Sequence, residues 1–246
     1  MEIIHIAEAS STNSFLRNWS NNHPEANETV VFADRQTAGR GQRGNYWESE
    51  PGKNITMSLL LKPQSVAADQ QFILSQIVSL AIAETLSEYT SGISIKWPND
   101  IYYRDRKICG MLIENDITDD IISRSIIGIG LNINQKKFRS DAPNPVSLSQ
   151  ITGKEYGIEE IISKVASGIV HNFHVLKSSS DSWINFQEKY AECLYRREGF
   201  HPFASEEGVF RAKIHHVEPS GLLVLEREFS GEKETFAFKE VRFVVE

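Results

Sequence analysis

The chain has 246 residues, of which 40% are hydrophobic and 24% charged, and its formal net charge is -7. These values predict a soluble globular protein with one large domain, or one large and one small domain, and they argue against a surface built broadly for phosphate backbones. No apolar run is long enough to span a membrane, and the two cysteines, Cys109 and Cys193, lie too far apart in sequence to suggest a disulfide framework or a zinc site. A cytoplasmic protein is therefore expected.

The first third of the chain alternates short apolar strands with helices. A strand over residues 2–9 runs into SSTN, Ser10–Asn13, whose hydroxyls can cap a helix. TVVFA, residues 29–33, predicts a buried strand, and the alternation in NITMSLLLK, residues 54–62, predicts a strand with one buried face. A polar loop with several glycines joins these two strands, and helical periodicity follows over residues 70–89.

The remaining elements predict a mixed domain followed by a small β domain. Residues 93–115 favour a strand broken at Pro98 and a hairpin turning at Arg104–Arg106, and SIIGIGLNIN, residues 125–134, is a further strand. Amphipathic helices are expected over 158–176 and 181–195, and short β-rich runs then reach the C-terminus. Because hairpins and loops join most of the strands, the fold class is α+β. We expect a domain over residues 1–195 and a small all-β domain over 196–246.

The six residues GRGQRG, Gly39–Gly44, have the G-x-G-x-x-G spacing of a dinucleotide-binding fingerprint, but their context does not fit one. Five residues separate the preceding strand from the first glycine, and the segment after the last glycine contains Pro51 and Gly52, which make a poor helix. The acidic residue expected about twenty positions later to hold a ribose is missing. Kinase signature motifs and a G-K-[ST] phosphate loop are also absent from the sequence. The match is coincidental.

Four polar features remain, and each allows a functional and a structural interpretation. Arg40 and Arg43 can fold over an anion, or they can belong to a flexible surface loop. KWPND, Lys96–Asp100, ends an apolar strand with five different chemical groups, although its last two residues can also form a simple turn after proline. Lys107 enters an otherwise apolar strand, where it is either a functional cation or a snorkelling edge lysine. Asn132 ends a strand whose glycines are typical of close approach by a ligand or another backbone.

Taken in order, SSTN, GRGQRG, KWPND, RKICG and GIGLNIN resemble the motifs of the biotin protein ligases, and they cover residues 10–134. The resemblance implies a mixed-sheet catalytic domain of the biotin/lipoate ligase type with a small C-terminal SH3-like β-barrel. It also implies a two-step reaction, in which biotin and ATP form biotinyl-5'-adenylate and pyrophosphate, and the biotinyl group then passes to a lysine of a biotin carboxyl carrier domain. Magnesium would accompany ATP, with ligands left unknown, and either a monomer or a homodimer is permitted.

The resemblance assigns roles to individual residues. Its implied catalytic residues are Lys107, Arg40 and Arg43. Its implied biotin-binding residues are Ser11, Thr12, Asn13, Gln36, Gly39, Arg40, Gly41, Lys107, Gly128 and Gly130. Its implied ATP-binding residues are Arg43, Trp47, Lys96, Asn99, Lys107 and Asn132. These roles agree with elementary chemistry, because a carboxylate that attacks a phosphate needs cations to neutralise two anions.

The chain departs from the family pattern in two respects. Gln42 stands where the family usually has arginine, so retention of the adenylate would rest more on Arg40 and Arg43. The sequence also starts almost directly at the catalytic domain, so a form without the N-terminal DNA-binding domain, and without repressor activity, is expected. Three other hypotheses remain: a ligase for another acyl acid such as lipoate, a biotin-binding sensor without catalysis, and a nucleic-acid module. The net charge of -7 disfavours the last.

Overall fold

A computed structural model of the chain describes residues 1–42, 45–140, 144–179 and 181–244. In these ranges the elements follow the order β1 Glu2–Ala9, α1 Thr12–Asn21, β2 Thr29–Gln36, β3 Ile55–Leu61, the short 3-10 helix η2 Ala68–Gln70, α2 Phe72–Ser87, β4 Ile93–Lys96, β5 Asp100–Tyr103, β6 Arg106–Thr118, β7 Ile121–Leu131, α3 Leu148–Thr152, α4 Ile158–Ser178, α5 Asp181–Glu192, β8 His201–Ser205, β9 Gly208–Val217, β10 Leu223–Arg227, β11 Lys233–Phe236 and β12 Arg242–Phe243.

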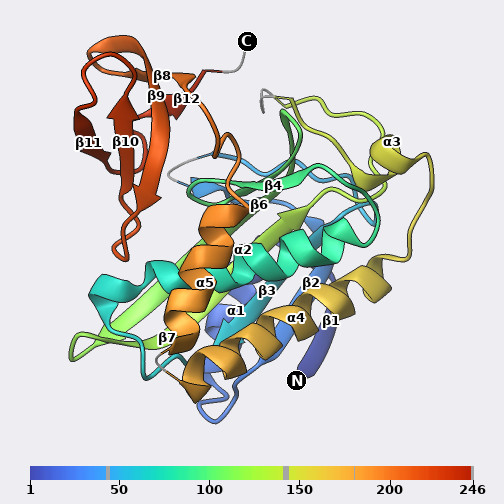
Figure 1. Cartoon of the computed structure of the whole chain (residues 1–246). Coiled ribbons are helices and arrows are strands. Elements are labelled where there is room, and N and C mark those ends of the chain that lie inside the picture. Colours follow the sequence, from blue (N-terminus) through green and yellow to red (C-terminus); the bar gives the residue numbers. More distant parts are fainter. Residues whose placement is uncertain (43–44, 141–143, 180, 245–246) are drawn as a thin grey trace.

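The strands form two sheets, and the expected α+β class is confirmed. Seven strands make a mixed sheet in the order β1-β2-β3-β7-β6-β5-β4, in which β1 and β2 are parallel and the other neighbours antiparallel. The last five strands form an antiparallel sheet in the order β11-β10-β9-β8-β12, as expected for the small SH3-like domain. Figure 1 shows this second sheet in orange and red beside one end of the first. The boundary between residues 195 and 196 stays a prediction.

Helices cover both faces of the seven-stranded sheet, and the alternation of β3 shows why (Figure 1). Leu59 and Leu61 belong to the main core, together with residues of α2 and α4. Leu60 points the other way and joins Leu16 of α1 in a smaller cluster. Because neighbouring residues of a strand face opposite sides, even-numbered positions of β3 lie under α1. Ser58 therefore lies on the α1 face, where its hydroxyl contacts Thr12 and Asn13 in the first turn of that helix.

Two segments differ from the elements expected from the sequence. The hairpin formed by β6 and β7 runs through residues 116–122, beyond the strand ends expected at 115 and 125. The sequence did not indicate this extension, because the distal part of the hairpin, which includes DITDD (residues 116–120), is largely exposed and needs no alternation of apolar residues. The short helix α3 was not expected either; a capping box between Ser147 and Gln150 begins it, and Gly153 ends it in the left-handed conformation.

Candidate active site

A cavity of about 750 Å³ lies where the N-terminus of α1, three central strands, the KWPND segment and the end of the second sheet meet. The sequence-predicted site residues that line it are Ser11, Thr12, Asn13, Gln36, Arg40, Gly41, Trp47, Lys96, Asn99, Lys107, Gly128, Gly130 and Asn132. Gly39 lies beside the cavity and accepts a backbone hydrogen bond from Trp47. Arg43 lies outside the described residues. Thirteen predicted residues from six separate segments of the chain thus meet at one cavity, while their individual roles stay predictions.

One side of the cavity, here called the polar wall, consists of Thr12, Asn13 and Gln36, and the fully buried Ser58 lies directly behind them. The hydroxyl of Ser58 lies 2.6 Å from Oδ1 of Asn13 and 2.8 Å from Oγ1 of Thr12. Asn13 is 3% exposed. Sheet register places Ser58 opposite Gly128, where a Cβ would lie 2.4 Å from Oδ1 of Asn13. Glycine at 128 is therefore required to let the asparagine amide lie flat against the sheet.

The amide of Gln36 has a fixed orientation in the polar wall. Its Oε1 accepts hydrogen bonds from the backbone N–H of Thr12 at 2.8 Å and from the Thr12 hydroxyl at 3.2 Å. A backbone N–H can only donate, so the oxygen of Gln36 must face the helix. The Nε2 group consequently occupies the other end of the amide and provides donors at the cavity side.

The opposite end of the cavity, here called the cationic end, consists of Lys96 and Lys107 with Trp47 and Asn132. The indole of Trp47 lies on the two glycines of neighbouring strands. A Cβ at Gly130 would lie 2.3 Å from the indole ring, and one at Gly110 would lie 3.0 Å from it. The glycines in these strands thus make room for an aromatic ring of the same chain, a contact that sequence reasoning did not foresee.

Lys107 reaches the cavity because of a β-bulge. The pairing of β5 with β6 shifts so that Ile101 faces Cys109 while Tyr102 faces Lys107, which leaves one extra residue in β6. Simple alternation would turn Lys107 toward the helices with Cys109, but the extra residue turns it toward the face of Gly110. Its Nζ lies 2.6 Å from Oδ1 of Asp100 and 5.7 Å from the centre of the Trp47 ring. Lys107 is thereby held in place by the last residue of KWPND.

Lys96 lies between aromatic rings at the junction of the two sheets. Its Nζ is 5.0 Å from the centre of the Tyr102 ring and 5.2 Å from that of Phe243. Burial lowers the pKa of the Lys96 ammonium, although Asp100 partly offsets this, and the positive charge of Lys107 lowers it again. A buried cation of this kind costs folding free energy, so its presence in the cavity suggests a use in binding an anion.

Two polar atoms of the cationic end have no hydrogen-bond partner within the described part of the chain. They are the indole Nε1 of Trp47, a donor, and Oδ1 of Asn132, an acceptor. Buried polar atoms in native proteins are nearly always paired, so an unpaired donor and acceptor beside one cavity are candidates for ligand contacts. Asn99 differs, because its Nδ2 already donates to the carbonyl of Met111 at 2.6 Å.

In the glycine loop, residues 39–47, the described residues 39–42 and 45–47 lie against one another at the cavity. Arg40 and Tyr46 form an isolated antiparallel bridge, and the N–H of Gly41 donates to the carbonyl of Asn45 at 2.7 Å. Beyond the loop, the carboxylate of Glu48 accepts hydrogen bonds from the backbone N–H groups of Arg139 and Ser140. The Glu48 contacts tie the end of the loop to the segment before α3. The side chain of Arg40 is directed toward β6, where it contacts Glu114.

The second sheet contributes one wall of the cavity. Phe238, Lys239, Val241, Arg242 and Phe243 line it. Trp97 of KWPND holds this sheet in place: its indole donates to the carbonyl of Gly221 at 2.9 Å, and its ring meets Phe238 edge-on. Trp97 is 3% exposed. The tryptophan of KWPND is therefore a contact between the two sheets.

Sequence reasoning missed several residues of the site. Ser58 carried a weak signal, as the one hydroxyl between the apolar residues of MSLLL. Glu114, which accepts a hydrogen bond from Asn13, carried a similar signal at the end of an apolar strand. The cavity-lining residues 238, 239 and 241–243 carried none, because their role depends on how the two sheets dock.

Neither a membrane-spanning helix nor a metal cluster is found in the described ranges. None of their helices combines the length and apolar character that crossing a bilayer requires. The same residues contain no group of three or more His, Cys, Asp or Glu side chains placed to ligate a metal ion.

Fold and cavity together define a two-sheet α+β protein in which a neutral polar wall faces a pair of lysines. A sequence model described as the biotin/lipoate A/B protein ligase family matches residues 6–132. Since this match covers just over half of the chain, the protein belongs to that family.

Individual relatives and solved structures support this membership. The biotin protein ligase from Aquifex aeolicus, solved in complex with biotin and ATP, is 28% identical, with a TM-score of 0.80 and 99% of each chain covered. The biotin–[acetyl-CoA-carboxylase] ligase of Paracoccus denitrificans is 28% identical over 79% of this chain and 82% of its own. The bifunctional ligase/repressor BirA of Bacillus subtilis is 30% identical over 84% of this chain, which spans 63% of that protein. The chain likewise spans 64% of the length of the bifunctional ligase/repressor BirA of Bacillus spizizenii.

Proposed function

We propose that this protein is an ATP-dependent biotin protein ligase. In the first step a carboxylate oxygen of biotin attacks the α-phosphorus of ATP, the bond to the bridging oxygen breaks, and pyrophosphate leaves with its electrons. In the second step the neutral amine of a carrier lysine attacks the acyl carbon of biotinyl-5'-adenylate. AMP leaves, the amine nitrogen loses its proton, and an amide bond remains. The acceptor is a biotin carboxyl carrier domain of a biotin-dependent carboxylase.

The polar wall is the observation that carries the choice of biotin. Gln36 directs donors toward the cavity, because its oxygen accepts hydrogen bonds from Thr12. Asn13 directs only an acceptor, since protein groups take both of its donors; its Oδ1 already accepts from the Ser58 hydroxyl and keeps a second lone pair for a ligand. A cyclic urea such as that of biotin has one carbonyl acceptor beside two N–H donors, so it satisfies both amides. The dithiolane ring of lipoate has no such groups, so it would leave the cavity-facing donors of the half-buried Gln36 without a partner, at a cost of about 1–3 kcal/mol, and would not use the remaining lone pair of Asn13.

The cationic end supports the adenylation step. Lys107 is held 2.6 Å from Asp100 in a partly buried position, and Lys96 lies in the same cavity. We assign Lys107 to the biotin carboxylate and the α-phosphate, where negative charge gathers as two anions react. Lys96, Asn99, Trp47 and Asn132 are assigned to the nucleotide, and Arg40 to the adenylate. Arg43 is assigned to the adenylate on its sequence position alone.

Magnesium enters this proposal as part of the substrate MgATP. Mg²⁺ at nucleotide sites is commonly held by phosphate oxygens, waters and one or two carboxylates. Asp100 lines the cavity, but its Oδ1 already pairs with Lys107. We therefore assign the ion no protein ligand. The glycine loop would cover the mixed anhydride and exclude the water that hydrolyses it. The free cysteines Cys109 and Cys193 support a reducing cytoplasmic setting, where ATP is also present.

The proposal is tested by weighing a carrier domain after incubation with the protein, MgATP and biotin. We expect a mass gain equal to one biotinyl group, together with pyrophosphate release. Parallel reactions omit ATP, use a carrier whose acceptor lysine is replaced by arginine, or supply lipoate in place of biotin. A gain with lipoate alone would transfer the protein to the lipoate branch of its family. Biotin binding without pyrophosphate release would instead support the sensor hypothesis.

A further inference from the structure

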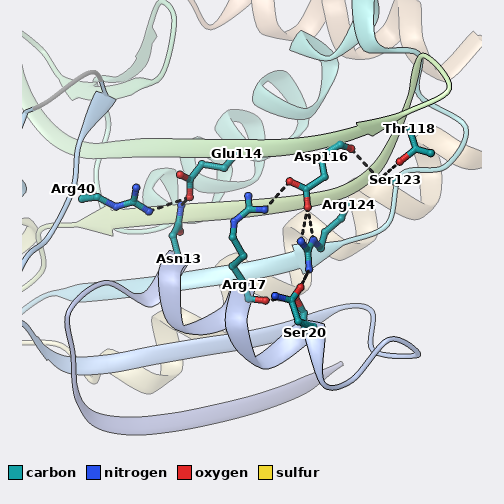
Figure 2. A network of polar contacts seen from close by, with 10 residues as sticks. Asn13, Arg17, Ser20, Arg40, Glu114, Asp116, Thr118, Ser123 and Arg124 are labelled. Carbon is teal, nitrogen blue, oxygen red and sulfur yellow. Dashed lines mark hydrogen bonds and ion pairs between the residues drawn. The ribbon is translucent and has the colours of Figure 1, made fainter.

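Glu114 on β6 connects two parts of the cavity that no sequence motif joins. Its Oε2 accepts a hydrogen bond from Nδ2 of Asn13 at 2.8 Å, and the same oxygen lies 3.3 Å from a guanidinium nitrogen of Arg40. Figure 2 shows the carboxylate between the start of α1 and the glycine loop. Asp116, two residues along the same strand, is engaged separately by Arg17 and Arg124.

The carboxylate determines which way the amide of Asn13 faces. An ionised carboxylate only accepts hydrogen bonds, and so does the carbonyl of Leu112, which lies 3.2 Å from the same Nδ2. Both donors of Asn13 are therefore used within the protein. Oδ1 is left at the other end, where it accepts a hydrogen bond from the Ser58 hydroxyl, lies against Gly128 and keeps a second lone pair. Asn13 can offer the cavity an acceptor and no donor.

The contact with Arg40 is weaker. At 3.3 Å, and with the Arg40 side chain 46% exposed, the pair belongs to the class of surface ion pairs worth about 0–1 kcal/mol. The hydrogen bond to Asn13 is shorter, at 2.8 Å, and Asn13 itself is buried. Glu114 therefore constrains the site through its contact with Asn13 and not through its contact with Arg40.

We propose that Glu114 is a positioning residue, which fixes the Asn13 amide with its oxygen toward the ligand and so makes the site selective for a ring N–H at that point. This inference rests on the proposed function, because it takes the ureido ring of biotin as the ligand that reaches Asn13. Glu114 touches neither biotin nor ATP in this scheme. Its effect passes through Asn13.

The test is the variant Glu114→Gln, which keeps the shape of the side chain but lets it donate or accept. The new amide can donate to Oδ1 of a turned Asn13, although the carbonyl of Leu112, which only accepts, still favours the original orientation. We expect biotin affinity, measured by calorimetry, to fall about three- to tenfold, the scale of one hydrogen bond to a partly misdirected amide. The KM for ATP and the kcat at saturating biotin should stay within about twofold of wild type. The matched control is Asp116→Asn on the same strand, which should leave biotin affinity unchanged.

A double-variant cycle separates positioning through Asn13 from general damage. In an Asn13→Ala background, Glu114→Gln should change biotin affinity by less than about twofold, since the group on which it acts is gone. Equal losses in both backgrounds would overturn the inference. So would a loss confined to the KM for ATP, which would mean that Glu114 acts through Arg40.

Ligand analogues give a readout that a merely structural role would not move. In two analogues, one or the other ureido N–H of biotin is replaced by oxygen. Wild type should discriminate against one of them by about tenfold, and Glu114→Gln should lose most of that discrimination, because a turned Asn13 can donate to the oxygen. Unchanged discrimination would contradict the inference. Biotin binding by wild type is measured by calorimetry before any variant is made. If wild type gives no heat with biotin, the proposed function itself fails, and not only the role of Glu114.

Discussion

The polar wall and the cationic end of the cavity differ in how far their polar groups are already paired within the protein. In the polar wall the amides of Asn13 and Gln36 are already oriented by protein partners. At the cationic end Trp47 and Asn132 each keep a polar atom without a partner in the described residues, and Lys96 is held by two rings. A neutral ring is best recognised by groups that need no rearrangement, whereas a reacting anion needs charge in a dry place that is available when it arrives.

The largest effect is expected from removing the cation nearest the proposed reaction. Lys107→Ala should slow adenylate formation by about 10²–10³-fold, the loss measured when one preorganised stabilising group is deleted. Single-turnover release of pyrophosphate measures this step, and calorimetry should show biotin affinity changed far less. Adenylate formation at a near-normal rate would remove Lys107 from the chemistry and make the cationic end a binding site only.

A control is needed because Lys107 is paired with Asp100. Removing the lysine leaves that carboxylate partly buried without its partner. The double variant Lys107→Ala/Asp100→Asn removes this unpaired carboxylate, so it should unfold at a higher temperature than Lys107→Ala while forming the adenylate just as slowly. Thermal unfolding of both variants shows whether a loss of activity follows a loss of structure.

Reversing one hydrogen bond in the polar wall should have the next largest effect. Gln36→Glu keeps an oxygen for the backbone N–H of Thr12 but replaces the cavity-facing donor with an acceptor. A ligand carbonyl would then meet a negative oxygen, and biotin affinity should fall by roughly 10–100-fold, as expected for about 1–3 kcal/mol. Isothermal titration checks this. Full affinity in the variant would mean that the ligand carbonyl binds elsewhere.

The sequence predicted the two ends of the cavity to different extents. SSTN, KWPND and the GIGLNIN strand stood out because polar groups and glycines interrupt apolar strands, and all three line the cavity. Even the buried serine of β3 had a local signal in its alternation. The side-chain direction of Lys107 had no such signal. It depends on a bulge in the pairing of β6 with β5, which the residue pattern of a single strand does not show.

Contacts between distant segments were also out of reach. Nothing near Trp47 shows that its ring will lie on Gly130, and nothing near Trp97 shows that it will bond to Gly221 of the second sheet. Both contacts follow from how whole elements dock. Local propensity and spacing describe one segment at a time, so they identify chemical groups better than the partners those groups will find.

A third prediction concerns function and stability at Lys96. Because burial lowers the pKa of this ammonium, its charged form is a cost to the folded state. Lys96→Met should fill the same space between Tyr102 and Phe243 without that cost. We expect an unfolding temperature equal to or above that of wild type, with the KM for ATP raised about tenfold by the loss of one charged contact. A clear fall in unfolding temperature, or an unchanged KM for ATP, would contradict this view of the cationic end.

The smallest effect is expected at Asp116, which lies outside the cavity and ties α1 to the β6–β7 hairpin (Figure 2). Burial alone would raise the pKa of this carboxyl, but hydrogen bonds from Arg17 and Arg124 hold it below its ordinary value. A group whose pKa is depressed by folding stabilises the protein above its unfolded pKa, about 3.9, and loses that contribution as pH falls through the folded value.

Asp116→Asn should therefore lower the unfolding free energy at pH 7 by about 1 kcal/mol, the scale of a partly exposed ion-pair network. The difference between variant and wild type should shrink below about pH 4, where protonation of Asp116 removes the same interaction from wild type. Urea unfolding at several pH values measures both curves. Biotin affinity should be unchanged in this variant, because the polar wall is held by its own hydrogen bonds to β2 and β6. A parallel loss of biotin affinity would show that it depends on this distant anchor.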